Sequence, residues 1–134
     1  MHLDDYKHKD VTDKIIKAFY KVYNTLGYGF LEKVYENAMI LELRSLDLIV
    51  EKQKMIKVYY EGLEVGEYFA DLIVENSVII ELKASETLCK EHESQLINYL
   101  KATDIEIGLL LNFGKTPEFK RKIFTNDKKK ILSQ

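Results

Sequence analysis

The chain has 134 residues, of which 46% are hydrophobic and 31% are charged, and its formal net charge is −2. This length fits one domain with a buried core, and no apolar run approaches the roughly 20 residues that span a bilayer. The first residues lack the basic-then-apolar pattern of a signal peptide. The single cysteine, Cys89, excludes an intrachain disulfide and a cysteine zinc cage. We therefore expect one cytoplasmic domain without a membrane segment.

The slightly acidic charge balance bears on the partners of the protein. Proteins that cover nucleic acid with a broad surface are usually basic, so the balance argues against that class. It is compatible with a nuclease, because carboxylates gathered to hold a cation lower the net charge. It is equally compatible with an ordinary cytosolic protein, so charge alone leaves the function open.

Two helices are predicted in the first part of the chain. Apolar residues recur at helical spacing from about residue 10 to 26 and, after Gly27-Tyr28-Gly29, from about residue 30 to 46. We expect the second helix to bury a stripe that consists of Leu31, Val34, Tyr35, Ala38, Leu41 and Ser45. Glycine is scarce and Pro117 is the only proline, so residues 1–134 are expected to form one domain with a core at about 11–124.

The spacing of the hydrophobic residues changes in the middle of the chain. Residues 50–84 are rich in Val, Ile and Tyr and carry turn signals at residues 61–62 and 75–77, which predicts three strands joined by two hairpins. A third helix is expected at about 87–102 and a buried strand at 105–113. Residues 119–124 fit either a strand or a short helix.

A basic tail, residues 125–134, ends the chain and is expected to be frayed and solvated. The predicted order is helix, helix, three strands, helix and strand. Such an order indicates an α/β fold with a mixed β-sheet flanked by helices.

The most informative residues are three charged side chains on neighbouring strands. Alternation along residues 78–84 places Glu81 and Lys83 on the same face of an otherwise apolar strand, where charges are costly to desolvate. If residues 75–77 form a three-residue loop, Asp71 lies directly opposite Glu81, and Phe69 lies opposite Lys83.

Two carboxylates held this close usually share a proton or a cation. Oxygen ligands with no His or Cys nearby in the sequence favour a hard cation, Mg²⁺ or Mn²⁺. The same pattern is also compatible with a simpler structure, in which Asp71 ends a strand while Glu81 and Lys83 form a surface pair on a solvated sheet face.

Polar residues on two predicted helices could join these carboxylates. His92, Gln95 and Tyr99 share one face of the third helix at i, i+3 and i+7, although a half-exposed helix face gives the same pattern. Glu32 opens the second helix, where an acidic residue also stabilises the helix dipole without any further function.

These residues resemble a known superfamily. Asp71 followed by a hairpin and Glu81-Leu82-Lys83 resembles the D…E-x-K signature of PD-(D/E)XK nucleases, and the predicted element order is similar to their restriction-endonuclease-like αβββαβ core. Gln95-x-x-x-Tyr99 resembles the Q-x-x-x-Y element of RecB-like members.

Residues 11–124 further resemble the small prokaryotic proteins of the GxxExxxR family. The matching segments are Gly29-Phe30-Leu31-Glu32 with Val34-Tyr35, Asp71, Glu81-Leu82-Lys83-Ala84, His92-Glu93-Ser94-Gln95-Leu96, and Leu109-Leu110-Leu111-Asn112-Phe113-Gly114. One position departs from the family pattern, because the arginine expected four residues after Glu32 is Glu36 here. Whatever that arginine does in related proteins is therefore not assumed for this chain.

The resemblance implies a divalent-metal-dependent nuclease. It implies that Asp71, Glu81 and the backbone carbonyl of Leu82 bind Mg²⁺ or Mn²⁺. Lys83 would then orient the attacking water or stabilise charge on the phosphate. Glu32 would complete the metal shell through water or hold a second cation.

The resemblance also implies which residues position the substrate, although it does not identify the biological substrate. Gln95, Tyr99 and His92 would position the phosphodiester or the Lys83 ammonium. We expect the substrate to be nucleic acid, specifically DNA. Two other functions remain open: a non-catalytic module that keeps the nuclease fold and binds nucleic acid or protein, and a phosphohydrolase for small nucleotides. A homodimer is a further option, because so small a chain often needs a second copy to cover a duplex, although no sequence feature supports it.

Overall fold

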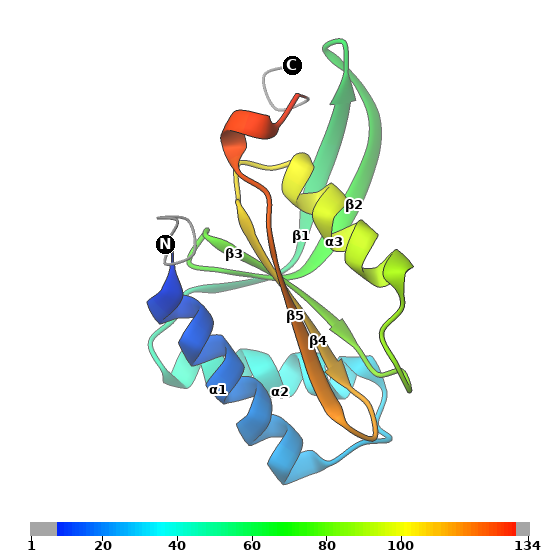
Figure 1. Cartoon of the computed structure of the whole chain (residues 1–134). Helices are drawn as coiled ribbons and strands as arrows, with labels where there is room; N and C mark the ends of the chain where they lie inside the picture. The colour runs from blue at the N-terminus through cyan, green and yellow to red at the C-terminus, as the bar shows by residue number, and fades with distance from the viewer. Residues whose placement is uncertain (1–7, 131–134) are drawn as a thin grey trace, which may run out of the picture.

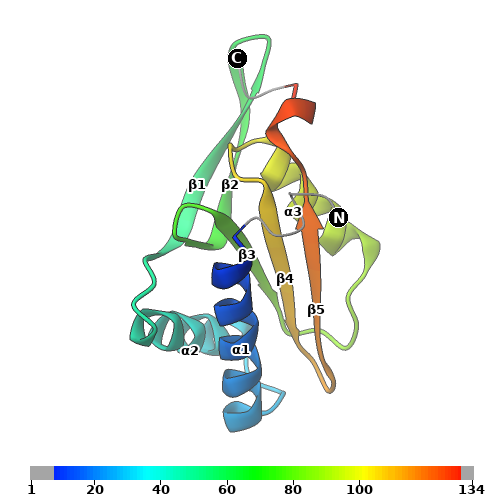
Figure 2. The ribbon, with the colours of Figure 1, turned by 60° about the vertical axis from the view of Figure 1, so that its left-hand side comes forward.

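In a computed structural model, which describes residues 8–130, the chain forms a mixed sheet between two layers of helices. Within those residues the five strands follow the order β1-β2-β3-β4-β5. The strands are β1 (Val50–Tyr60), β2 (Leu63–Val74), β3 (Val78–Lys83), β4 (Ile107–Phe113) and β5 (Pro117–Ile123). Helices α1 (Lys9–Leu26) and α2 (Glu32–Ser45) cover one face of the sheet and α3 (Lys90–Lys101) covers the other (Figures 1 and 2).

This arrangement confirms the predicted α/β fold and the restriction-endonuclease-like order of elements. The pair β3–β4 is parallel and is joined by the α3 crossover, whereas all other neighbouring pairs are antiparallel. All seven residues of β4 are buried, as expected for a central strand with a helix layer on each side. No helix within residues 8–130 is long and apolar enough to cross a membrane.

Alternation along β3 divides the core into two clusters. Val78, Ile80 and Leu82 pack in the cluster beneath α1 and α2. Ile79 packs in the smaller cluster beneath α3. Glu81 has the parity of Ile79, so its side chain belongs to the α3 face of the sheet.

Helix α2 buries a different face from the one predicted. Its fully buried apolar residues are spaced four apart: Tyr35, Met39 and Leu43. Four residues of the predicted core stripe are instead exposed, namely Leu31 (80%), Val34 (38%), Leu41 (73%) and Ser45. The helix carries two apolar stripes, and periodicity within one helix cannot decide which stripe meets the sheet. We call Leu31, Val34, Ala38 and Leu41 the outer stripe of α2.

The C-terminal segment is more ordered than predicted. Residues 117–123 form a strand, which settles the strand-or-helix alternative. A 3-10 helix spans Asn126–Lys128, and the Lys129 Nζ donates to the carbonyls of Thr103 and Ile105 at 2.7 Å each. The expectation of a frayed tail is therefore wrong for residues 126–130, and residues 131–134 lie outside the described part of the chain.

Candidate active site

The hairpin between β2 and β3 has the register that the sequence predicts. Val74 pairs with Val78, and Leu72 pairs with Ile80. The three-residue turn at 75–77 is accommodated by left-handed backbone at its first two residues, both with φ slightly above 50°. Continuing the register by one step places Asp71 opposite Glu81.

The β2–β3 ladder ends at Leu72 and Ile80, so one part of the prediction is wrong. Phe69 does not pair with Lys83. It pairs with Met55 of β1, while Lys83 lies beside Asn112 of β4. The two strands separate beyond Leu72 because β2 stays with β1, whereas β3 stays with β4.

The two carboxylates fill the opening where the strands separate. The N–H of Asp71 donates to Glu81 Oε2 at 2.9 Å, and the N–H of Leu82 donates to Asp71 Oδ2 at 2.8 Å. Each carboxylate thus replaces a missing ladder partner on the opposite strand. Because the N–H and C=O of one residue point to the same side of an extended strand, the Leu82 carbonyl also faces this opening.

A backbone irregularity lies at the same level of the sheet. Ala70 and Ile73 are three residues apart but both pack in the cluster beneath α3, so the alternation of β2 breaks between them, at Asp71. Across the β1–β2 pair, Gln53 occupies the position opposite Asp71 and has φ +49°. Left-handed backbone is uncommon for a residue with a Cβ and is concentrated at functional sites.

Gln53 connects Asp71 to a buried carboxylate on α2. Its Nε2 lies 3.0 Å from Glu36 Oε1 and 3.4 Å from Asp71 Oδ1. Glu36 is buried, and its Oε2 accepts a bond of 3.2 Å from Lys33 Nζ. The residue that departs from the GxxExxxR pattern is therefore part of the network behind Asp71, a role that its sequence position alone did not reveal.

The electrostatics of the site favour protons or cations. Burial, followed by the negative charge of Asp71, raises the pKa of Glu81 to about 8, and the charge of Glu32 adds to this shift. Burial also raises the pKa of Asp71, and Glu36 contributes in the same direction. The Lys83 ammonium and the backbone N–H donors oppose both shifts without cancelling them.

Glu32 stands apart from the two central carboxylates. It lies exposed in the first turn of α2 and acts on Glu81 through charge. In the described part of the chain, no three or more His, Cys, Asp and Glu side chains are grouped so that they could hold a metal ion. The structure therefore brings Asp71, Glu81 and Leu82 together, while Glu32 does not join them as a third grouped carboxylate.

Helix α3 brings two of its three predicted residues to the site. Tyr99 is buried, and burial together with the charges of Glu81 and Asp71 raises the pKa of Tyr99 to about 12. Gln95 forms a side-chain hydrogen bond with Tyr99. His92 has a structural contact instead: its Nδ1 accepts the N–H of Cys89 at 3.4 Å and so caps the start of the helix.

A hollow of about 350 Å³ lies between α3 and β2, beside Tyr99. Gln95 and Tyr99 line it from α3 and Tyr68 lines it from β2. The rings of Tyr68 and Tyr99 lie 5.4 Å apart. Tyr68 was not predicted as a site residue, because nothing in the sequence distinguishes it from the other tyrosines of this hairpin.

The chain immediately after Lys83 is held by a buried amide. Asn112 Oδ1 accepts the N–H of Ser85 at 3.0 Å, and Asn112 Nδ2 donates to the Ser85 carbonyl at 2.9 Å. Gly114 packs so close to the same carbonyl that a Cβ at this position would clash with it. These contacts fix the end of β3 and thereby the backbone that carries Lys83.

The comparisons with known proteins agree with this geometry. A family model described as the PD-(D/E)XK nuclease superfamily matches residues 9–123. The chain therefore belongs to the PD-(D/E)XK nuclease superfamily. No curated protein matches the sequence significantly.

Two solved structures share the fold. A crystal structure of SSO0001 is similar with a TM-score of 0.54 and 19% identity over 72% of this chain and 51% of that chain. An alkaline exonuclease (LHK-Exo) from Laribacter hongkongensis is similar with a TM-score of 0.51 and 12% identity over 71% of this chain and 56% of that chain. The chain thus corresponds to about half the length of these proteins, and the likeness concerns the fold alone.

Proposed function

We propose that this protein is a divalent-metal-dependent nuclease that hydrolyses phosphodiester bonds in DNA. The observation that carries the proposal is the pair of carboxylates, Asp71 and Glu81, which meet where β2 and β3 separate and which share the sheet end with Lys83. Membership of the PD-(D/E)XK nuclease superfamily supports phosphodiester chemistry. The fold shared with an alkaline exonuclease is consistent with it.

The donor set suits a hard cation such as Mg²⁺ or Mn²⁺. Asp71 and Glu81 each have a second carboxylate oxygen beside the one that accepts a backbone N–H, and the Leu82 carbonyl faces the same opening. Burial and neighbouring carboxylates raise the pKa values of both groups, so their negative charges are poorly compensated, and a divalent ion would compensate them. When bound, the ion would lower the pKa of a water molecule and polarise the scissile phosphate.

The remaining residues would act on the substrate. Lys83 is held at the end of β3 and would place a fixed positive charge where negative charge builds on the phosphate. Gln95 and Tyr99 would orient the phosphodiester from the α3 side, next to the hollow that they line. Glu32 would act on the outer hydration shell from its exposed position, and His92 would keep the start of α3 in place.

Within the superfamily, we propose that the chain belongs to the GxxExxxR family and acts in the cytoplasm. The first proposal depends on Gly29, Glu32 and the segments that follow, in which Glu36 replaces the family arginine. Glu36 keeps a link to the site through Gln53, so the position remains connected although its charge is reversed.

Cleavage of DNA tests the proposed function. Supercoiled plasmid and single-stranded DNA are incubated with wild type and with Glu81→Ala in Mg²⁺, in Mn²⁺ and in excess chelator. We expect wild type to cut only with a metal ion and Glu81→Ala to be inactive. Binding of DNA by wild type without cutting under any of these conditions would instead favour a non-catalytic module, and cleavage of mononucleotide esters alone would favour a small-molecule phosphohydrolase.

A further inference from the structure

The outer stripe of α2 has the spacing of a helix–helix seam. Its members follow one another at intervals of three, four and three residues: Leu31, Val34, Ala38 and Leu41. This is the a/d pattern with which one helix packs against another. At 3.6 residues per turn, the stripe lies roughly 120° around α2 from Tyr35, Met39 and Leu43, which contact the core. It is on the flank toward α1, where Ala38 packs partly against the core while Leu31 and Leu41 stay exposed. The helix therefore presents a second apolar face that the sheet does not cover.

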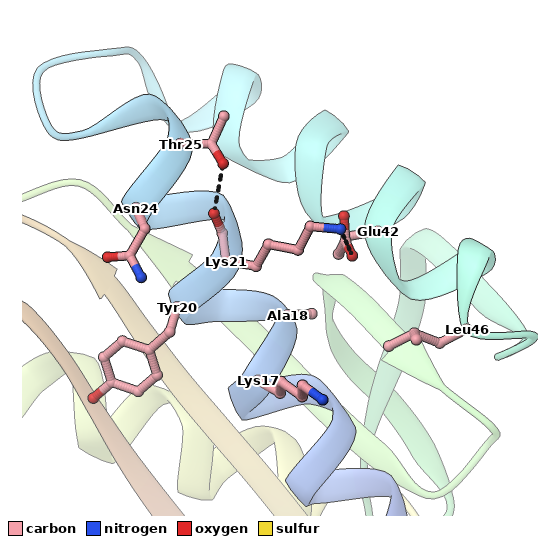
Figure 3. A pocket seen from close by; sticks show the side chains of 8 residues that line it. All are labelled: Lys17, Ala18, Tyr20, Lys21, Asn24, Thr25, Glu42 and Leu46. Carbon is pink, nitrogen blue, oxygen red and sulfur yellow. Dashed lines mark hydrogen bonds and ion pairs between the residues drawn. The ribbon is translucent and has the colours of Figure 1, made fainter.

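The same surface also contains grooves. A hollow of about 630 Å³ lies between α1 and α2, where Lys21 of α1 reaches across to Glu42 of α2 (Figure 3). Lys17 of α1 and Leu46, which follows α2, also line it. An adjoining hollow of about 280 Å³ is lined by Val22 and Leu26 of α1 together with Ala38 and Leu41. Protruding leucines and apolar hollows thus lie side by side.

We propose that the outer stripe of α2, with the adjoining α1–α2 groove, binds a second copy of this chain. A two-fold dimer requires one patch that is complementary to itself. This patch meets the requirement, because it offers exposed leucines as knobs and the groove as the hole into which the partner's leucines fit. The Lys21–Glu42 ion pair of 2.8 Å at its rim supplies both signs of charge, so two rims can face each other without net repulsion.

The exposed apolar area agrees with a dimer of ordinary size. Tyr28 and Phe30 precede the stripe and are also exposed. Aromatic side chains offer roughly 150–250 Å² each, and leucine and valine somewhat less, so the exposed parts of these two residues, Leu31, Val34 and Leu41 amount to roughly 500 Å². A standard interface buries about 800 Å² per partner, of which roughly three fifths are apolar.

A second exposed apolar region provides a matched control. The outer part of the β1–β2 hairpin projects from the sheet (Figure 1) and exposes Leu63 to 72%, almost the same as Leu41 at 73%. The substitutions Leu41→Glu and Leu63→Glu therefore add the same charge to the same residue type at equal exposure. Both residues lie outside the buried core, so both variants are expected to fold, which circular dichroism verifies.

The experiment measures mass in solution by sedimentation equilibrium over a concentration series. We expect a dimer for wild type and for Leu63→Glu, and a dissociation constant raised by roughly 100-fold or more for Leu41→Glu, because the charge enters the seam twice. Ala38→Leu, which extends the seam without charge, is expected to change the constant by much less than Leu41→Glu.

Three results would overturn the proposal. The first is a monomer for wild type up to several hundred micromolar. The second is a dimer that Leu41→Glu leaves intact, and the third is a dimer that Leu63→Glu dissociates equally well. None of these measurements depends on DNA cleavage. The proposed interface can therefore be disproved without disproving the proposed nuclease activity, and the nuclease activity can be disproved without disproving the interface.

Discussion

The two faces of the sheet differ in what they bury. Beneath α1 and α2 the cluster is apolar and aromatic, with the ring of Phe113 stacked on Tyr35 at 4.3 Å and edge-on to Phe19 at 4.9 Å. Beneath α3 the cluster is smaller and borders Glu81. The carboxylate of Glu81 is buried, and burial raises its pKa. Apolar packing on the first face stabilises the fold, whereas the buried carboxylate on the second face lowers the stability of the protein.

The same strands serve both faces. In β3, Ile80 and Leu82 point into the large cluster while Glu81 between them faces the site. Rigid packing on one side therefore fixes the carboxylate on the other side, which is a requirement for preorganised electrostatics. If this comparison is correct, substitutions on the α1/α2 face should change the stability of the protein without changing its response to metal. Substitutions of the carboxylates on the α3 face should change the response to metal.

The largest stability effect is expected on the α1/α2 face. Phe113→Ala removes a buried ring from the centre of the aromatic group and should destabilise the protein by about 3–5 kcal/mol. The stabilisation that Mn²⁺ adds should stay at the wild-type value. Urea unfolding with and without Mn²⁺ measures both quantities. Phe69→Ala, at a half-exposed position of the hairpin, serves as the control and should cost about 1 kcal/mol or less.

A pH effect of the order of a few kcal/mol is expected on the α3 face. The pKa of Glu81 is about 8 in the folded protein and about 4.3 in the unfolded chain. Between these pH values the folded state therefore keeps a proton on Glu81 that the unfolded state has lost. The metal-free protein should therefore lose stability as the pH rises from about 5 to about 8. Urea unfolding in chelator at pH 5, 6, 7 and 8 measures the slope.

Two variants identify the source of that slope. Glu81→Gln should flatten it, while Glu61→Gln, at an exposed turn residue, should leave it at the wild-type value. Stability that rises with pH over this range would mean that the Glu81 carboxylate is not held in the unfavourable environment described here.

A smaller effect is expected at Asp71. Asp71→Asn removes a partly buried negative charge that also raises the pKa of Glu81, and it keeps an oxygen that can accept the N–H of Leu82. The metal-free protein should gain on the order of 1 kcal/mol at neutral pH, seen as a higher melting temperature. Mn²⁺ should then stabilise the variant less than wild type. An equal metal response in both proteins would place the cation elsewhere.

The smallest stability effect is expected at Gln53. Gln53→Gly relieves the left-handed backbone at φ +49° but loses the hydrogen bonds of the amide to Glu36 and Asp71. Because the two effects oppose each other, stability should change by about 1 kcal/mol or less. Because the substitution removes the amide between Glu36 and Asp71, cleavage should fall although the fold is retained. Thermal melts and a cleavage assay on the same preparation test both halves, and full activity in Gln53→Gly would show that this amide does not position Asp71.

Local pattern predicted most of the fold. Helical spacing, the two turn signals and the unbroken apolar strand gave the elements in their correct order, and the three-residue loop gave the β2–β3 register. The core face of α2 could not be predicted, because Leu31 and Leu41 follow the helical period as well as Tyr35 and Met39 do. Only the packing of α1 and the sheet distinguishes the two stripes.

The site could be predicted in its centre but not in its surroundings. Asp71, Glu81 and Lys83 lie on two strands joined by one short hairpin. Gln53 could not be predicted as a site residue, because an unbroken hairpin with a two-residue turn at 61–62 places it opposite Ala70. In the structure a bulge between Val58 and Tyr59 shifts the register by one residue, which brings Gln53 opposite Asp71. A bulge of this kind leaves no reliable mark in the sequence.

One measurement tests the central claim that charge at the end of β3 acts on the reaction and not on metal affinity. Calorimetric titration with Mn²⁺ and plasmid cleavage are run in parallel on wild type, Lys83→Ala and Glu81→Ala. Lys83 offers only donors and cannot be a metal ligand, so Lys83→Ala should bind Mn²⁺ at least as well as wild type and cut DNA roughly 100-fold more slowly or worse. Glu81→Ala should lose both properties. Cleavage by Lys83→Ala at the wild-type rate would contradict the account, because the activity would then come from another site.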